Sequence, residues 1–299
     1  MTSVIIVTYN QAHLLKRALA SLSEQTTNNF EIIVVDDGST DTTAYLCRNF
    51  SNDIPNLVYI GLDKMLHAGL AESGNIGIRA ASGDNILFTD SDCVPGKNWV
   101  ELMVQSLTNG FIIAGSVASP TSDYFMLCHN VAQFHHFLPE MSRGRTEFIA
   151  GANMGIRKSV FRESGMFEKG RPMAQDMEWL LRARTHGFQP IFEPDAMITH
   201  IPEGRSKLWQ ILNYATAHAE STIQLRIQYS NLLKTPFLLK SPLLIFFASP
   251  VIAMYSTIEN FVSNPRLLRY LHTFPVILII RLAWCKGAIR GLNNMMHEK

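Results

Sequence analysis

The sequence predicts an α/β protein whose Rossmann-like, mostly parallel sheet is flanked by helices. Short apolar runs, each long enough for a buried strand, recur at residues 4–7, 31–35, 57–60 and 85–89. Apolar residues at helical spacing separate these runs. Strand–helix units that repeat at intervals of roughly 30 residues are typical of a parallel, doubly wound sheet.

The elements follow one another in a regular order. After the first strand, Leu15, Leu19 and Leu22 form a helical stripe, and Asn10 is predicted as the N-cap of that helix. Two more helices are expected, from near residue 41 to about 50 and from about 71 to 81. Right-handed crossovers then place the ends of the first, second and fourth strands along one crevice, where open α/β sheets bind ligands.

Composition separates the tail of the chain from its body. Charged residues make up 17% of the 299 residues, below the usual quarter, so part of the chain is expected to avoid water. Residues 205–299 contain 11 Lys/Arg and 3 Asp/Glu, a net charge of +8, whereas the first 204 residues contain 15 and 22, a net charge of −7. A basic, apolar tail suggests contact with an anionic membrane surface. The four scattered cysteines fit a reducing compartment, and the early first strand predicts no signal peptide.

The fourth predicted strand runs directly into Asp90 and Asp92. Carboxylates at positions i and i+2 of an extended chain point to the same side. They are hard oxygen ligands that suit Mg²⁺ or Mn²⁺, and Mg²⁺ often completes its shell with water and substrate phosphate. The pair therefore predicts a metal–diphosphate site; the alternative is a polar turn after a core strand.

Two other strand ends carry residues suited to a nucleotide. The aromatic face of Tyr9 can stack on a base, and the Asp37 carboxylate can accept a hydrogen bond from a base N–H or a ribose hydroxyl. The alternative for residues 36–39 is an ordinary strand-to-helix turn. A glycine-rich dinucleotide-binding or P-loop sequence is absent after the first strand, which disfavours those classes.

Several segments in order resemble the family 2 glycosyltransferases, which have the GT-A fold. The resemblance covers about residues 3–205 and rests on residues 7–10, 36–39, 75–77, 90–92, 148–154, 175–179 and 194–200. It implies a transferase that uses a nucleotide-diphospho-sugar donor and a divalent cation, Mn²⁺ or Mg²⁺, with no nucleic-acid partner. The substrate-binding residues that it implies are Thr8, Tyr9, Asn10, Asp36, Asp37, Asn75, Asp90, Asn153 and Trp179.

The resemblance also implies metal ligands and a catalytic base. Asp90, Asp92 and His200 are the expected metal ligands, although a histidine at a strand end can instead be satisfied by backbone groups. Asp176 is the expected general base of an inverting transfer, in which a carboxylate takes the proton of the acceptor hydroxyl. Its alternative role is that of a carboxylate in the first turn of a helix. For Trp179, core packing is at least as plausible as contact with a sugar.

Two positions depart from the family pattern. Gly74 stands where family members often have an arginine before the Asn-x-Gly element. A basic contact to the nucleotide is therefore missing at this position, which leaves the identity of the nucleotide base open. Gln175 replaces the glutamate of the Glu-Asp pair and is expected to tune the proton affinity of Asp176.

The chain is expected to contain a catalytic domain, residues 1–205, and a helical tail, residues 206–299. Residues 1–95 form the nucleotide-binding half of the domain and residues 96–205 its acceptor-side half, with residues 124–145 as a variable loop or helix near the acceptor. In the tail, a helix is predicted over 208–229, followed by an uncharged run at 241–258 and an 11-residue run at 270–280. We expect residues 233–299 to dip into the cytoplasmic leaflet or form a tight hairpin. Full spanning, a soluble helical subdomain and a dimer interface are the alternatives.

These observations favour an inverting glycosyltransferase on the cytoplasmic face of the cell membrane. Its acceptor is expected to be a saccharide or a lipid-linked molecule, in cell-surface polysaccharide or glycolipid synthesis. One rival is a nucleotidyltransferase, which would need a glycine-rich, basic loop where residues 8–12 stand. The other is a non-catalytic, nucleotide-sugar-binding scaffold, against which the intact Asp90, Asp92 and Asp176 argue.

Overall fold

The computed structural model describes residues 1–63, 67–120, 123–262 and 265–297, and its chain divides into two compact units. The sheet unit contains Met1–Ala118, His136–Gly170 and Gln175–Ile201. The helical unit contains Ser119–His135, Arg171–Ala174 and Pro202–Lys299. Residues 119–135 thus belong with the C-terminal helices, although the sequence placed them in the catalytic domain. Residues 263, 264, 298 and 299 of the predicted membrane segment lie outside the described residues.

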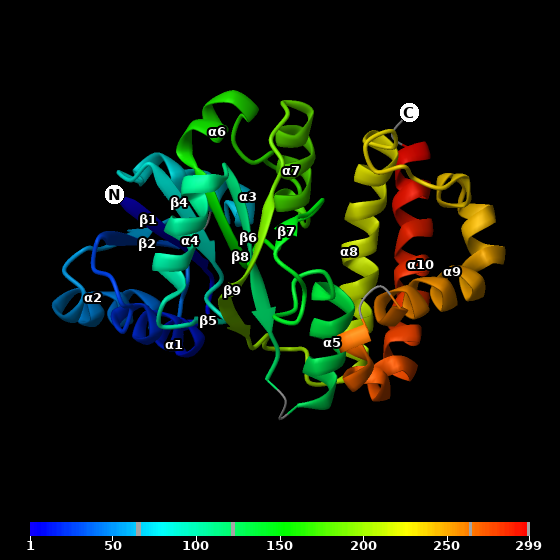
Figure 1. The fold of residues 1–299 in the computed structure, drawn as a ribbon, viewed down its shortest axis with the longest axis horizontal. Coiled ribbons are helices and arrows are strands. Elements are labelled where there is room, and N and C mark those ends of the chain that lie inside the picture. The colour runs from blue at the N-terminus through cyan, green and yellow to red at the C-terminus, as the bar shows by residue number, and fades with distance from the viewer. Residues whose placement is uncertain (64–66, 121–122, 263–264, 298–299) are drawn as a thin grey trace. The chain divides into compact units, whose positions relative to one another are not determined.

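The described part of the sheet unit contains one nine-stranded sheet (Figure 1). Strands β3 (Leu57–Gly61), β2 (Phe30–Asp36), β1 (Thr2–Thr8) and β4 (Asn85–Thr89) lie side by side in this order and are parallel. This half confirms the four predicted strands. Because parallel strands share an orientation, Thr8, Asp36 and Thr89 end at the same edge of the sheet.

The other half of the sheet mixes strand directions. Strand β8 (Asn153–Arg157) is antiparallel to both β4 and β6 (Ile112–Ala118). Strand β9 (Ile191–His200) is parallel to β6, and β5 (Cys93–Pro95) and β7 (Gly144–Arg145) are antiparallel to β9. The sheet is therefore mixed but mostly parallel, as predicted.

Helices flank this sheet and bury apolar stripes against it. They are α1 (Ala12–Ser23), α2 (Thr43–Asp53), α3 (Gly69–Ala80), α4 (Trp99–Asn109), α6 (Lys158–Ser164) and α7 (Gln175–Thr185). In α1 the buried face includes the predicted Leu15, Leu19 and Leu22. The predicted N-cap is wrong: Asn10 has a φ of 51°, a left-handed value that asparagine tolerates, and lies outside the helix. The carboxylate of Asp41 accepts the Ala12 N–H instead, at 2.9 Å.

The helical unit is built around α10 (Phe274–His297). This helix packs between α8 (Leu208–Gln228) and α9 (Pro242–Val262), and α5 (Tyr124–Phe134) also packs against it (Figure 1). Short 3₁₀ segments, η1 (Phe237–Lys240) and η2 (Pro265–Thr273), precede α9 and α10. Helices α8, α9 and α10 share an apolar core that consists of Ile223, Ile245, Cys285, Ala288 and Leu292.

Two helices of the described chain are long and apolar enough to cross a membrane by length and composition alone. They cover Pro242–Val262 and Pro265–His297; the mean hydropathy of each is 1.4, and 17% and 22% of their apolar windows are buried. The short apolar run predicted at residues 270–280 is thus part of a much longer helical segment. One or two such helices are weak evidence for membrane contact, since core helices of soluble proteins have the same composition.

Candidate functional site

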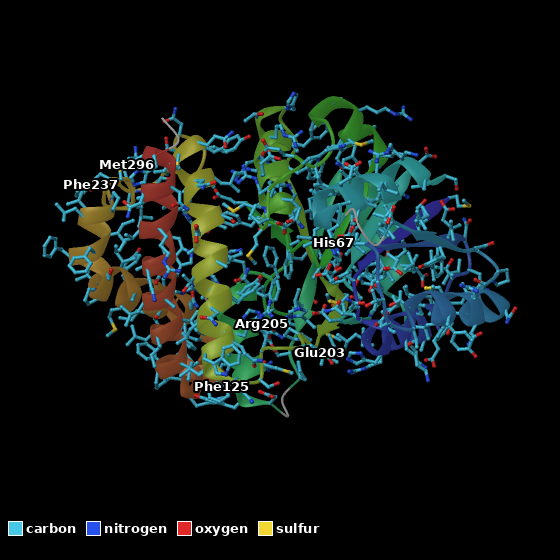
Figure 2. All side chains as sticks on the ribbon, turned by 180° about the vertical axis from the view of Figure 1, so that it is seen from behind. His67, Phe125, Glu203, Arg205, Phe237 and Met296 are labelled. Carbon is cyan, nitrogen blue, oxygen red and sulfur yellow. The ribbon has the colours of Figure 1, made fainter. Side chains whose placement is uncertain are left out.

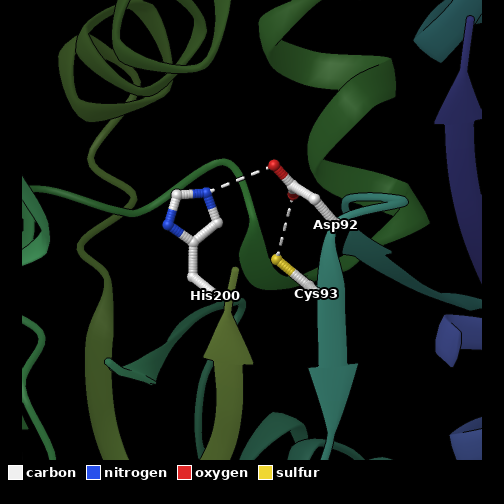
Figure 3. Close-up of side chains that lie close together, drawn as sticks. All are labelled: Asp92, Cys93 and His200. Carbon is white, nitrogen blue, oxygen red and sulfur yellow. Dashed lines mark hydrogen bonds and ion pairs between the residues drawn. The ribbon is translucent and has the colours of Figure 1, made fainter. Parts of the chain in front are cut away.

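Asp92, Cys93 and His200 meet at the edge of the sheet where β4 ends (Figure 3). Strand β5 pairs antiparallel with β9 so that Cys93 lies opposite His200. Asp92 Oδ2 lies 3.6 Å from His200 Nε2, and Cys93 Sγ lies 3.6 Å from Asp92 Oδ1. One ligand atom from each residue lies within 4.8 Å of the others. The structure therefore brings two of the three expected metal ligands together.

Cys93 is a member of this cluster that the sequence analysis missed. The four cysteines show no metal-binding spacing, and only the pairing of β5 with β9 reveals that this one faces His200. Burial raises the pKa of the Cys93 thiol well above its usual value, and the carboxylates of Asp92 and Asp90 raise it further.

Asp90 completes an acidic group at this edge. Asp90 has solvent-accessible surface, but protein atoms crowd its carboxyl, and this desolvation raises the pKa of Asp90 to about 7. The charges of Asp92 and Asp176 raise that pKa further, and the charge of His200 opposes the rise. Carboxylates held this close repel one another, and a divalent cation would relieve that repulsion. Two carboxylates and an imidazole also form a donor set that Mn²⁺ accepts, so the residues present fit the expected cation.

Asp176 lies in the first turn of α7, and its Oδ2 accepts the N–H of Gly151 at 2.9 Å. A Cβ at position 151 would stand 2.7 Å from Asp176 Oδ2, so a side chain there would displace this carboxylate. Burial raises the pKa of Asp176, although backbone N–H groups that bind the charged form oppose this rise. The structure thus fixes a carboxylate of raised proton affinity near Asp90.

The residues expected to bind the nucleotide base lie at the ends of β1 and β2. Tyr9 is 44% exposed, and its ring meets His67 edge-on with 5.0 Å between centroids. Asp37 is buried: Oδ1 accepts the N–H of Ala68 at 2.7 Å and Oδ2 that of Gly69 at 3.0 Å. In this structure Asp37 therefore holds the start of α3, and a base N–H would have to share these oxygens.

The neighbouring residues shape the same loops. Asp36 is buried and accepts hydrogen bonds from the Ser39 N–H at 2.8 Å and the Tyr59 hydroxyl at 2.7 Å, so it supports the turn. Asn10 links the first two loops, since its Oδ1 accepts the Thr40 N–H at 2.7 Å. Thr8 is buried, and its hydroxyl has no hydrogen-bond partner among the described residues.

Asn75, an expected substrate-binding residue, lies in the core. Its side-chain amide makes a double hydrogen bond with the backbone of Phe167, through the Phe167 carbonyl at 2.9 Å and the Phe167 N–H at 3.0 Å. Asn75 is 2% exposed. Its position ties α3 to the segment between α6 and α7.

Asn153 and Trp179 differ from expectation for the same reason. Asn153 has no exposed surface, donates to the carbonyls of Ser116 and Ala196 at 2.7 and 2.9 Å, and accepts from Trp99 Nε1 at 2.8 Å. Trp179 is also fully buried, and its Nε1 donates to the Gly165 carbonyl at 2.9 Å. In this structure both side chains serve core packing, which the sequence left open for the tryptophan, and their contact with substrate stays a prediction.

Glu178 and Arg182 hold the segment that precedes α7. Arg182 Nε lies 2.9 Å from Glu178 Oε1, and the same guanidinium donates to the carbonyls of Ser164 and Met166. Because the glutamate is buried, this (i, i+4) pair is more firmly held than a surface pair. This pair anchors α7, the helix that carries Asp176.

A mixed, mostly parallel sheet with an Asp-x-Asp pair at the end of β4 and a carboxylate on α7 defines a glycosyltransferase of the GT-A fold. Residues 3–165 match the family described as Glycosyl transferase family 2, and the chain belongs to this family.

Named relatives and solved structures agree with this assignment. The chain is 28% identical to Glycosyltransferase AglE of Haloferax volcanii over 202 residues, which are 66% of each chain. It is similar in structure to the mannosyltransferase PcManGT from Pyrobaculum calidifontis in complex with GDP-Man and Mn²⁺, with a TM-score of 0.65, 18% identity and coverage of 98% and 87%. It also resembles S. aureus TarS 1–349 in complex with UDP-GlcNAc, with a TM-score of 0.56, 15% identity and coverage of 100% and 92%.

The sequence matches leave part of each relative uncovered. Validoxylamine A glucosyltransferase of Streptomyces hygroscopicus subsp. jinggangensis is 38% identical over 103 residues, which are 34% of this chain and 24% of that protein. The match to AglE covers just under two thirds of that relative. The structural likeness, at identities below one fifth, extends the fold over the chain.

Proposed function

We propose that this chain transfers a sugar from a nucleotide-diphospho-sugar to a hydroxyl of a saccharide or lipid-linked acceptor, with inversion at the anomeric carbon. The observation that carries the proposal is the Asp176 carboxylate, fixed by the Gly151 N–H and electrostatically coupled to Asp90. A separate carboxylate, in addition to the Asp-x-Asp pair, suits single-displacement chemistry. In such a reaction one set of residues binds the leaving group and a different residue accepts the proton.

The donor is proposed to bind along the ends of β1, β2 and β4. Tyr9 offers its exposed ring to the base, and Asp36 and Asp37 shape the loop beside it. Asp90, Asp92 and His200 would hold a divalent cation, Mn²⁺ or Mg²⁺. Bound there, the cation supplies positive charge against the diphosphate leaving group. Two structural neighbours support such a donor, since their titles name GDP-Man with Mn²⁺ and UDP-GlcNAc.

At the anomeric carbon the reaction makes one C–O bond and breaks one, and a proton moves from the acceptor hydroxyl to a carboxylate. The acceptor oxygen forms a bond to the anomeric carbon from the face opposite the diphosphate, and the bond between that carbon and the diphosphate oxygen breaks. Asp176 accepts the hydroxyl proton, and the nucleoside diphosphate leaves with the bonding electron pair. Because burial raises the pKa of Asp176, its carboxylate is a stronger base than an exposed aspartate.

We place this activity on the cytoplasmic face of a membrane. The support is the exposed apolar side of α9, where Phe246, Phe247, Val251, Tyr255 and Val262 are each 65–73% exposed. Phe237, labelled in Figure 2, adds a further exposed ring from η1. Lysines and arginines flank these segments, as expected for contact with anionic headgroups. An acceptor presented at a membrane is naturally lipid-linked.

The test begins with a screen of nucleotide sugars by thermal shift, with and without Mn²⁺. The proposed donor is expected to stabilise the protein only in the presence of the cation, and Asp92→Ala should remove both that effect and donor hydrolysis. Activity that survives Asp92→Ala would contradict the metal assignment. Asp176→Asn should abolish transfer and leave donor binding intact; loss of binding as well would contradict its role as the base.

A further inference from the structure

Cys93 is a metal-ligating side chain that the proposed donor site does not use. The cation of that site would be held by Asp90, Asp92 and His200, through oxygen and nitrogen atoms. The sulfur of Cys93 faces the same Asp92 carboxylate, on the strand that pairs with the strand of His200 (Figure 3). A sulfur at this place matters because sulfur and oxygen ligands favour different metals.

The pairing of β5 with β9 holds Cys93 beside His200. The Ile201 N–H donates to the Asp92 carbonyl at 2.9 Å. Hydrogen-bonded and non-hydrogen-bonded pairs alternate along an antiparallel ladder, so the next pair, Cys93 with His200, is a non-hydrogen-bonded one. The side chains of such a pair share one face and lie closer together than those of a hydrogen-bonded pair. The sheet itself therefore sets the distance between the sulfur and the imidazole.

A tight turn brings Asp92 to the same place. The Cys93 N–H donates to the Asp90 carbonyl at 3.1 Å, so Asp92 lies within a turn that precedes β5. The two oxygens of Asp92 have different neighbours. Oδ1 lies 3.6 Å from Cys93 Sγ, and Oδ2 lies 3.6 Å from His200 Nε2. Oxygen, sulfur and nitrogen donors thus converge from one turn and two strands.

The separations between these donor atoms suit tetrahedral coordination. Zinc binds sulfur at about 2.3 Å and nitrogen or oxygen at about 2.0–2.2 Å, so two ligand atoms of one zinc ion lie roughly 3.3–3.7 Å apart. The two contacts of 3.6 Å fall in this range, and one ligand atom from each residue lies within 4.8 Å of the others. Three protein ligands leave a fourth position for water or substrate, as in catalytic zinc sites.

Burial distinguishes the sulfur from an ordinary core thiol. Cys93 has no exposed surface and His200 is 7% exposed, whereas the Asp92 side chain is 16% exposed. Free cysteines are often buried as small apolar side chains, which is the alternative role for Cys93. A sulfur that only filled the core would be expected among apolar groups, but this one faces a carboxylate. The arrangement therefore favours a ligand over a packing residue.

We propose that Asp92, Cys93 and His200 form a site for a thiophilic divalent cation, with Zn²⁺ preferred to Mn²⁺ or Mg²⁺. A thiolate is a soft ligand that selects zinc, and mixed nitrogen, oxygen and sulfur sites bind zinc more tightly than manganese. The thiol proton passes to solvent as the metal–sulfur bond forms, because the cation deprotonates a coordinating thiol. The proposal rests on the proposed function only in placing this cation beside the donor diphosphate.

The test titrates the full chain with Co²⁺, a spectroscopic substitute for zinc, without nucleotide sugar. Bound cobalt should show the near-ultraviolet absorption of sulfur-to-metal charge transfer, which Zn²⁺ should remove and excess Mn²⁺ should not. Cys93→Ser should abolish this absorption. It should also weaken Zn²⁺ binding by at least the roughly 10–100-fold that follows the loss of an outer partner of a metal ligand. Cys47→Ser changes another fully buried cysteine of the sheet unit and should keep both properties.

Three outcomes would overturn the proposal. They are cobalt binding without charge-transfer absorption, equal Zn²⁺ affinity in Cys93→Ser and the parent chain, and absence of zinc binding. Asp92→Ala should also remove the absorption, and its survival in that variant would contradict a shared site. Stabilisation by the donor with Mn²⁺ requires no sulfur and is measured separately. The zinc site and the proposed function can therefore fail independently of each other.

The other cysteines provide a second route if Cys93→Ser does not fold. X-ray absorption at the zinc edge of the parent chain should show one sulfur at about 2.3 Å, and a shell of nitrogen and oxygen alone would overturn the proposal. The chain contains four cysteines. Charge-transfer absorption that persists in Cys47→Ser, Cys128→Ser and Cys285→Ser, each made alone, assigns the single sulfur to Cys93. Its loss in any of these three would place the sulfur elsewhere and refute the site.

Discussion

At the residue scale, the contact between Gly151 and Asp176 has the most direct chemical consequence. The carboxylate is held by a backbone N–H, and the absence of a Cβ on Gly151 makes room for it. Glu178 and Arg182 fix the helix that carries it. The position of the proposed base is therefore set by backbone geometry and a buried ion pair, and not by the motif residue alone.

The raised pKa of Asp176 predicts the pH dependence of transfer. A base must be deprotonated, so kcat should fall as the pH drops through the pKa of Asp176. Because burial raises that pKa, the acid limb should lie above the pH range of an ordinary aspartate. A pH–rate profile at saturating donor and cation measures this. Asp176→Asn should remove the limb and about 10²–10⁴ of the rate; an unchanged limb in this variant would assign it to another group.

Gly151→Ala tests whether the Asp176 carboxylate must be held in place. The backbone at Gly151 does not require a positive φ, so the added methyl acts by contact with Asp176 Oδ2, 2.7 Å away. We expect kcat to fall by roughly 10²-fold, as small misplacements of catalytic groups do, with the donor KM unchanged. In an Asp176→Asn background the same change should add little, because the two residues act as one unit. Additive losses would contradict the positioning role.

At the element scale, two pairings decide the architecture. The short β5 strand brings Cys93 against His200 on β9 and so assembles the candidate metal site from distant parts of the sequence. In the helical unit, Gly287 and Gly291 let α10 approach the backbone of α8. A Cβ at Gly287 would stand 2.0 Å from the Thr216 carbonyl oxygen.

Gly287→Ala is expected to separate α8 from α10. Neither backbone can yield easily, so the overlap should cost at least the roughly 1–3 kcal/mol typical of an overpacked core. Urea unfolding followed by tryptophan fluorescence and limited proteolysis of the helical unit would measure this loss. Lys286→Ala, at the exposed neighbouring position, is the matched control and should change the free energy of unfolding by about 0.5 kcal/mol or less. Equal stability of the two variants would refute the close contact.

At the scale of the whole molecule, the chain combines a sheet unit that contains the candidate donor site with a helical unit that exposes an apolar helix face. Residues 247, 251, 255, 258 and 262 recur at intervals of three or four along α9, so they form one stripe, and each is exposed. The opposite side of α9 packs on α10. One covered and one exposed side suits a helix that lies in the membrane interface.

Phe247→Ser with Val251→Ser should release the protein from anionic vesicles. The two side chains are 73% and 69% exposed, and burial of an apolar side chain of this size is worth about 1.5–3 kcal/mol. The double variant should therefore bind vesicles about 10²-fold or more weakly in a sedimentation assay. Tyr45→Ser, at a 67% exposed position in the sheet unit, should bind like the parent chain. Undiminished sedimentation of the double variant would contradict the membrane face.

Local pattern in the sequence was enough to predict much of this protein. Apolar runs bounded by polar turns predicted the first four strands, because the length and apolar character of such a run are properties of the strand's own residues. The order of short motifs predicted the glycosyltransferase family, which the match over residues 3–165 shows. The same patterns marked Asp92 and His200 as metal ligands, and the structure places the two side chains next to each other.

Only the tertiary structure decided which of these residues lie at the surface of the candidate site and which lie in the core. Asn75, Asn153 and Trp179 lie in motif segments, yet their polar groups form hydrogen bonds with groups elsewhere in the chain. Cys93 joined the metal cluster, and residues 119–135 joined the helical unit, through contacts between segments far apart in the chain. The physical reason is that periodicity reports one element's own preference for burial, whereas a site depends on which elements pack together, and that is settled by long-range contacts.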